Sequence, residues 1–352
     1  MKRGKSIGKY LSLAKKYLKL LLILVLVLIY LTPPVLILAS YKFKFDNRNR
    51  ELIYGVSFSA RQAEKFGLNP NEVLEALITD AGFKRFRLMS YWSDIEKTKG
   101  KYDYSELDSQ IDAVGRGGGK VSLAIGLRQP RWPECFAPSW AKDKPISQYQ
   151  NDLNKFIQTT MTRYKDNPVV ESWQLENEFH LDVFGNCPDH SRQRLIEEYK
   201  LAKETDSQKP ILLSLANNYF GFPVGNPRPD VFGVSVYSRV YEGRFLKSYF
   251  TYPFPSWYYG GRAGITKMLT NRNSILHELQ LEPWGTKDIS EMTIAEQDES
   301  MDLKRVQSQL KFGEQIGFKT IDLWGGEWWY WRKVTLNDPS IWDAVKTHIN
   351  QK

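Results

Sequence analysis

Short apolar runs recur along residues 52–352, and most segments between them have the spacing of polar and apolar residues that helices show. Eight runs have the length and the β-branched or aromatic content of buried strands. They cover residues 52–59, 83–89, 121–127, 169–175, 211–215, 231–237, 274–279 and 320–324. Helices are predicted over residues 70–81, 104–114, 147–164, 190–205, 260–269, 300–316 and 341–349.

The first of these helices has the clearest start. Asn69 is a favourable N-cap, Pro70 suits the first helical position, and Glu72 stands three residues after the cap. Gly82 provides the stop signal. This segment therefore predicts a helix in which the local signals and the apolar spacing agree.

The alternation of strands and helices defines the expected fold class. Alternating β and α segments imply a parallel sheet. Eight such units in about 300 residues predict an α/β protein with a single (β/α)8 barrel, the TIM barrel. A doubly wound open sheet is the alternative, but no glycine-rich fingerprint follows the first strand.

Residues 20–40 form the one continuous apolar segment, and their length is sufficient to cross a bilayer. A cluster of Lys and Arg precedes them and is expected to stay in the cytoplasm. The run is long for a signal peptide and ends in a poor cleavage site, so an uncleaved signal anchor is favoured over a cleaved signal. Pro33 and Pro34 would kink such a helix.

The expected layout is a basic cytoplasmic tail (1–19), a transmembrane signal anchor (20–40), a linker (41–51) and a catalytic barrel (52–352). The chain carries a net charge of +9, of which the first 50 residues contribute +10, so the remainder has −1. A nearly neutral body gives no electrostatic basis for binding nucleic acid. We expect a single-pass protein of the cell membrane, monomeric, with its barrel outside the cytoplasm.

Cys135 and Cys187 are the two cysteines of the chain. A location outside the cytoplasm would permit a disulfide between them, and two free thiols are the alternative. They follow the third and fourth strands, which are neighbours in a barrel. We therefore expect them to lie near each other on the active-site face.

Polar and charged residues stand where the predicted strands end. The central example is the run 169–175, which leads into Glu176-Asn177-Glu178. In a barrel of this kind the functional residues lie at the C-terminal ends of the strands. Read in order, these ends carry Arg87, Arg128 and Glu134, Asn177 and Glu178, Tyr237, Glu278, and Trp324. Two glutamates on non-adjacent strands, with an Arg, an Asn and a Tyr nearby, are what acid/base glycosyl transfer requires.

The constellation resembles the retaining glycoside hydrolases of clan A, which include family 5-like cellulases, mannanases and β-galactosidase-like families. The resemblance is carried by residues 86–108, 123–134, 173–179 (WQLENEF), 230–237, 275–285 (ILHELQLEPWG) and 321–331 (IDLWGGEWWYW). It implies that Glu178 is the acid/base and Glu278 the nucleophile.

The same resemblance assigns the residues that contact the substrate. Asn177 would bind the sugar 2-hydroxyl, Arg87 and Tyr237 would hydrogen-bond the nucleophile, and Trp324 would form the floor of the sugar site. Arg128, Trp132 and Glu282 are further candidates for substrate binding.

Glu278 and Glu282 compete for the role of nucleophile, because alternation along a strand puts both on one face. Apolar residues continue only through Leu279, and Pro283 disfavours a longer strand. Glu278 is therefore expected at the strand end and Glu282 in the loop above it.

The leading interpretation is a membrane-anchored glycosidase that cleaves a β-linked carbohydrate with retention. One alternative is an inactive carbohydrate-binding or scaffold barrel, which the presence of both glutamates disfavours. Another is a lyase or aldolase, which would need a Schiff-base lysine or a metal cluster at a strand end. No metal or cofactor is expected, because His180, His190, His277 and His348 lack ligand spacing.

Overall fold

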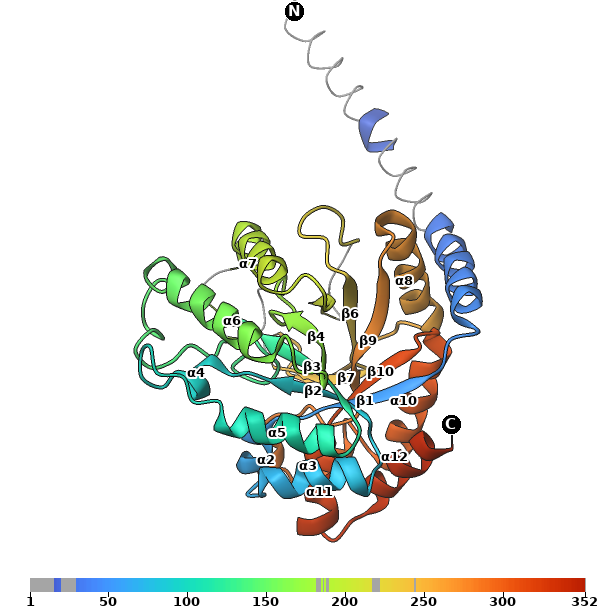
Figure 1. Cartoon of the computed structure of the whole chain (residues 1–352). Helices are drawn as coiled ribbons and strands as arrows, with labels where there is room; N and C mark the ends of the chain where they lie inside the picture. The colour runs from blue at the N-terminus through green and yellow to red at the C-terminus, as the bar shows by residue number, and fades with distance from the viewer. Residues whose placement is uncertain are drawn as a thin grey trace, which may run out of the picture.

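The computed structural model describes residues 16–19, 30–181, 185, 187, 190–216, 222–243 and 245–351. Eight parallel strands close into a barrel in the order β1-β10-β9-β6-β5-β4-β3-β2 (Figure 1). They are β1 (Ile53–Ser57), β2 (Arg85–Met89), β3 (Lys120–Ile125), β4 (Val170–Leu175), β5 (Ile211–Leu215), β6 (Val231–Val236), β9 (Asn273–Gln280) and β10 (Thr320–Trp324). The predicted (β/α)8 barrel is confirmed, and each predicted run coincides with one barrel strand.

Long helices surround these strands (Figure 1). They are α3 (Pro70–Thr79), α5 (Ser105–Arg116), α6 (Gln150–Tyr164), α7 (Arg192–Thr205), α8 (Ser256–Thr270), α10 (Leu303–Ile316) and α12 (Ser340–Asn350). In α3 the Asn69 side chain accepts from the Asn71 N–H, and Pro70 occupies the first turn, as its capping signals predict. Val73, Leu74 and Leu77 are buried on one face of this helix, so it packs on the barrel through its apolar stripe.

Shorter elements follow the C-terminal ends of the strands and form the rim around the barrel mouth. They are α2 (Ala60–Lys65), α4 (Trp92–Ile95), η1 (Ile146–Gln148), the hairpin β7 (Arg239–Glu242) and β8 (Ser248–Thr251), η2 (Ile289–Glu291), α9 (Ile294–Asp298) and α11 (Gly326–Thr335). The sequence pattern did not predict them. Trp328, Trp329 and Trp331 of α11 are buried in the hydrophobic core, so these late aromatic residues have a packing role.

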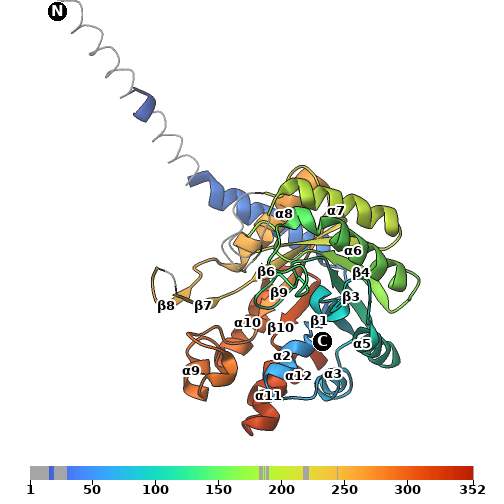
Figure 2. The same cartoon turned by 90° about the vertical axis from the view of Figure 1, so that its left-hand side faces the viewer.

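Residues 30–47 form a continuous helix that lies beside α8 in both views (Figures 1 and 2). Leu36 and Phe43 of this N-terminal helix are buried against the barrel. The contact is close because α8 presents glycines: a Cβ on Gly261 would approach the Leu36 carbonyl oxygen to 2.3 Å, and one on Gly264 the Ala39 carbonyl oxygen to 2.5 Å. Residues 41–47 are therefore a packed helix, which corrects the expectation of a linker over 41–51.

The expected anchor over residues 20–40 lies partly in this helix and partly outside the described residues, since 20–29 are not among them. Within the described part of the chain, no helix is both long enough and apolar enough to span a membrane.

Candidate active site

Glu278 lies near the end of β9 and is almost fully buried. Its Oε1 accepts a hydrogen bond from Arg87 Nη1 at 2.7 Å, and its Oε2 accepts one from the Tyr237 hydroxyl at 2.8 Å. The donors come from β2 and from the residue after β6, so three parts of the barrel fix this carboxyl group. Both of its oxygens are held in place before any substrate arrives.

Arg87 joins the two strands that carry the glutamates. It is fully buried, and its guanidinium donates to Gln174 Oε1 at 2.6 Å, to Asn177 Oδ1 at 2.8 Å and to Glu278. Below it, His277 lies between Gln174 and Asp322, with ring nitrogens 3.0 Å and 2.6 Å from their oxygens. The guanidinium thus rests on a polar network that fills the barrel interior.

Asn177 follows β4, and its carboxamide has one fixed orientation. Its oxygen accepts from Arg87, and its nitrogen donates to Glu134 Oε2 at 3.0 Å. Its peptide N–H donates to the Arg128 carbonyl at 2.7 Å. The carboxamide is therefore held between a cation on one side and an acid on the other.

Glu178 follows directly and has a left-handed backbone, with φ of 42°. Its peptide N–H donates to Ser214 Oγ at 2.8 Å. Burial, followed by the nearby Glu278 carboxylate, raises the pKa of Glu178 to about 7. A carboxyl group with this pKa carries a proton over much of the neutral range and can act as a general acid.

Glu176 has a different environment from Glu178. Its two carboxylate oxygens accept from the N–H groups of Leu127 and Arg128 at 2.7 and 2.9 Å, and Arg194 lies 3.3 Å away. It thereby connects the ends of β3 and β4. Glu176 therefore has a structural role, because these bonds fix the position of Asn177 and Glu178 relative to the end of β3.

The two glutamates share a cavity of about 580 Å³ at the barrel mouth. Seven of the nine residues that the sequence suggested for the site line it: Trp132, Asn177, Glu178, Tyr237, Glu278, Glu282 and Trp324. Arg87 and Arg128 do not line it. Arg87 supports Glu278 from below, and Arg128 holds Glu134 at 3.3 Å and the Leu181 carbonyl at 2.8 Å.

Glu282 lies in the loop after β9, as the sequence suggested. Its Oε1 accepts from Trp324 Nε1 at 2.7 Å and from Arg131 Nη1. Its Oε2 is buried and has no hydrogen-bond partner among the described residues. A buried carboxylate oxygen without a donor needs an explanation, and Glu282 is among the residues that line the cavity.

Glu134 and Arg131 also line the cavity, although Glu134 was expected only at a strand end, without a role, and Arg131 was not singled out. Burial, partly opposed by the Arg128 charge, raises the pKa of Glu134 to about 8, which favours the protonated form of this carboxyl group at neutral pH. Arg131 has φ of 88° and Glu134 has φ of 73°. The signal was the density of charge in RQPRWPE after the third strand, but only the folded loop reveals where these side chains point.

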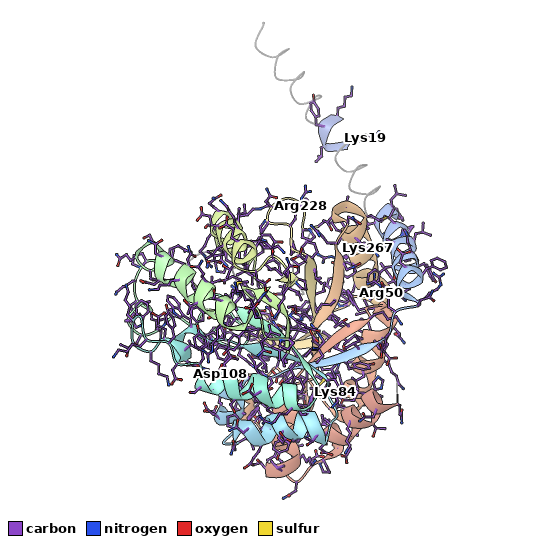
Figure 3. All side chains as sticks on the ribbon, in the orientation of Figure 1. Lys19, Arg50, Lys84, Asp108, Arg228 and Lys267 are labelled. Atoms are coloured by element: carbon purple, nitrogen blue, oxygen red, sulfur yellow. A yellow bond between two sulfur atoms is a disulfide. The ribbon has the colours of Figure 1, made fainter. Side chains whose placement is uncertain are left out.

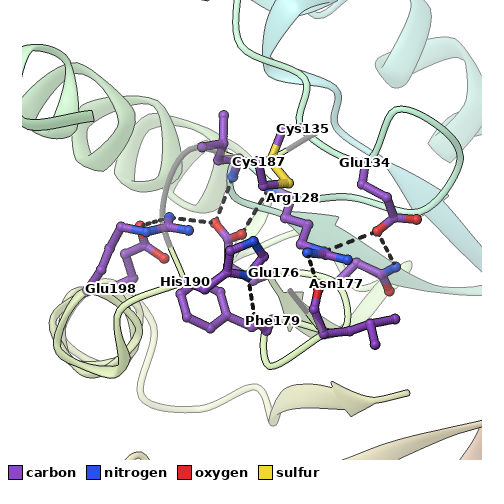
Figure 4. The surroundings of a disulfide bond; sticks show 12 residues. Arg128, Glu134, Cys135, Glu176, Asn177, Phe179, Cys187, His190 and Glu198 are labelled. Atoms are coloured by element: carbon purple, nitrogen blue, oxygen red, sulfur yellow. Dashed lines mark hydrogen bonds and ion pairs between the residues drawn. A yellow bond between two sulfur atoms is a disulfide. The ribbon is translucent and has the colours of Figure 1, made fainter. Parts of the chain in front are cut away.

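Cys135 and Cys187 form a disulfide, with their Cα atoms 5.3 Å apart. This confirms that the loops after β3 and β4 lie side by side. Figure 4 shows the bridge next to Arg128, Glu134 and Asn177, whose side chains point toward one another. The disulfide therefore restrains the loop that supports Asn177.

The (β/α)8 barrel and its two-glutamate cavity resemble the clan A glycoside hydrolases, and the chain is similar to several known proteins. No family model matches the chain. In sequence, the chain is similar to the β-galactosidase Bga of Halorubrum lacusprofundi, with 26% identity over 147 residues. That match covers 35% of this chain and 21% of the relative, so the chain matches about a fifth of the relative's length.

Solved structures show the same fold. A GH5_18 protein from Streptomyces cattleya, in complex with GlcNAc, superposes with a TM-score of 0.54 at 14% identity, covering 78% of this chain and 70% of that one. The exo-β-1,4-mannosidase Op5Man5 from Opitutaceae bacterium strain TAV5 gives a TM-score of 0.52 at 15% identity, covering 78% of this chain and 51% of that one.

Proposed function

We propose that the barrel is a glycoside hydrolase that cleaves a β-linked carbohydrate with retention of configuration. The observation that carries the proposal is the difference between two carboxyl groups in one cavity. Glu278 accepts from Arg87 and Tyr237, whereas burial raises the pKa of Glu178 to about 7. Such a division of environments is how a pair of carboxyl groups divides the roles of nucleophile and acid.

In the proposed first step, Glu278 attacks the anomeric carbon, and a covalent bond forms between its carboxylate oxygen and the sugar. Glu178 donates its proton to the glycosidic oxygen, so the leaving group departs as a neutral alcohol. In the second step, Glu178 accepts a proton from water, and that water attacks the anomeric carbon. The Glu278 carboxylate then leaves, and both residues return to their starting states.

The named sequence relatives are β-galactosidases, and this likeness supports a β-glycosidic bond as the substrate class. The aromatic side chains that line the cavity can bind sugar, because aromatic rings combine apolar area with a polar group. Chromogenic β-glycosides of different sugars provide the screen that identifies the substrate.

Matched variants then test the assignment of residues. Glu278→Gln should reduce kcat by at least about a thousandfold, because the nucleophile is lost. Glu282→Gln should act mainly on KM, since Glu282 is proposed to contact the sugar. Carbohydrate binding without turnover by the wild-type protein would instead support an inactive binding barrel.

We also propose that the N-terminal region attaches the barrel to the cell membrane, with the barrel outside the cytoplasm. The apolar sequence of residues 20–35 and the preceding Lys and Arg residues support this orientation. The N-terminal helix has a second, exposed apolar side opposite α8. It carries Tyr30, Leu31, Val35, Leu38, Tyr41 and Phe45. The disulfide suits an oxidising compartment.

Basic residues lie at the same edge of the barrel. Arg50 follows the N-terminal helix, and Lys267 belongs to the adjacent α8 (Figure 3). Positive charge beside an apolar helix face suits anionic lipid head groups. Protease treatment of intact cells should degrade the barrel if this orientation is right. A barrel that is protected until the cells are opened would contradict it.

A further inference from the structure

Two cavities at the barrel mouth meet at one wall. The first is the catalytic cavity, and the second, of about 660 Å³, lies beside α2 and α5. Four residues line both cavities: Gln62, Lys65, Arg131 and Trp132. The side chain of Arg131 is only 10% exposed, so it is packed within the wall.

Arg131 is fixed by two acids from other parts of the rim. Its guanidinium binds Glu282 through Nη1 and Glu327 through Nη2, the latter at 2.7 Å. Glu327 is itself fully buried and accepts from the N–H of Ser59, just after β1. The wall therefore joins the rim segments that follow β1, β3, β9 and β10 through charge-assisted hydrogen bonds.

The same guanidinium covers the ring of Trp324, with its central carbon 4.1 Å from the ring centroid. Trp324 ends β10, which borders β9 on the side away from β6, β5 and β4. Glu178, after β4, is on the side where the leaving group must be protonated. If the retained sugar lies toward Trp324, Arg131 blocks the position of a further sugar in that direction.

Glu282 lines the catalytic cavity and has one acceptor oxygen without a partner among the described residues. One of its oxygens binds Trp324 and Arg131, and the other is buried without a partner among the described residues. Leaving a buried carboxylate oxygen without a donor is unfavourable, and a sugar hydroxyl would supply the donor. A hydroxyl on the terminal ring fits this position, because the wall ends the cavity there.

We infer that the Arg131-Glu282-Glu327 wall makes the protein exo-acting, so that it removes one sugar at a time from the non-reducing end and recognises a hydroxyl of that sugar through Glu282. This inference rests on the proposed glycosidase activity. It adds the mode of action and the residues that impose it.

The wild-type protein tests this directly with β-linked tetrasaccharides labelled at the reducing end, built from the sugar that the aryl-glycoside screen identifies. The expected products are free monosaccharide and a series of labelled oligosaccharides, each one sugar shorter than the one before. Release of a disaccharide or a longer unit from the non-reducing end would overturn the inference. Failure to cleave any glycoside, including aryl monosaccharides, would instead remove the proposed function.

A variant of the wall provides the second test. Arg131→Ala should join the two cavities and raise the ratio of aryl disaccharide to aryl monosaccharide cleavage by about tenfold. Arg163→Ala is the matched control and should leave the ratio unchanged, since this arginine pairs with Asp108 and lines neither cavity. An unchanged ratio in a folded Arg131→Ala protein would contradict the role of the wall. If that variant does not fold, the products of the wild-type protein still show whether it is exo-acting.

Discussion

Among single residues, chemically identical side chains at the barrel mouth have different surroundings. Glu178 and Glu278 are both buried at one cavity, yet the pKa of Glu178 is raised to about 7, whereas Glu278 is bound by a guanidinium and a phenol. Glu134 is a third case, because burial raises its pKa while one of its oxygens accepts a hydrogen bond from the Asn177 amide. Environment, more than residue type, assigns the role of each glutamate.

The pH dependence of activity should follow Glu178. Its pKa is raised to about 7, so the acid form required for the first step is present below that pH and is lost above it. A plot of kcat/KM against pH should therefore fall on the alkaline side of neutrality. With a 2,4-dinitrophenyl glycoside, whose leaving group needs no proton, the Glu178→Ala variant should not show this alkaline decrease in kcat/KM. If the decrease persists unchanged in the variant, an ionisable group other than Glu178 causes it.

Glu134 should behave as a neutral acid that positions Asn177. Glu134→Gln should keep most of the activity at pH 6, whereas Glu134→Ala should lose about tenfold to a hundredfold, because the Asn177 amide loses its acceptor. The pKa of Glu134 rises on folding from 4.5 to about 8, so wild-type stability should decrease as pH rises through this window.

Thermal unfolding checks the second part of this prediction. Glu134→Gln has no proton to lose, so its melting temperature relative to the wild type should increase from pH 5 to pH 9. A difference that is constant with pH would show that Glu134 is ionised in the folded protein.

At the scale of elements, the barrel strands could be predicted because parallel strands buried on both faces give nearly continuous apolar runs, as in residues 121–127. Helix α11 could not be predicted, because its Trp residues are buried on several sides and give no single apolar stripe. The hairpin β7–β8 was also missed, because it is short and stands outside the barrel.

The residues of the site could likewise be predicted only in part from the sequence. Glu178, Glu278 and Arg87 could be found from the sequence, because they stand at the ends of recognisable strands. Arg131 could not be assigned a role, because its left-handed backbone and its partners Glu282 and Glu327 depend on three loops meeting in space. Strand ends follow from local pattern, whereas loop geometry depends on tertiary contacts.

The loop after β3 should depend on its disulfide. Cys135→Ser with Cys187→Ser should lower the free energy of unfolding by about 2–4 kcal/mol, because a crosslink across 52 residues restrains the unfolded chain. Activity should fall as well, since the loop carries Arg131 and Glu134. Urea unfolding of the wild type with and without reductant measures the effect. Equal stability in the two conditions would contradict it.

At the scale of the whole molecule, the N-terminal helix and the barrel form one packed unit. Gly261 permits this contact, because a Cβ there would lie 2.3 Å from the Leu36 carbonyl oxygen. Gly261→Ala should destabilise the full chain by about 1–3 kcal/mol, although alanine is the better helix former. In a chain that begins at residue 48, the same substitution should be neutral or stabilising. If the substitution lowers the free energy of unfolding equally in both chains, the contact with the N-terminal helix is not the cause.

In the proposed mechanism, Glu278 forms a covalent bond with the sugar, and Glu178 first donates and then accepts a proton. The most direct test is to trap that intermediate with a 2-deoxy-2-fluoro glycoside of the preferred sugar and to map the labelled peptide by mass spectrometry. We expect inactivation with one sugar attached to Glu278, and release of a product with retained configuration in normal turnover. A label on Glu282, or turnover with inversion and no trapped sugar, would contradict it.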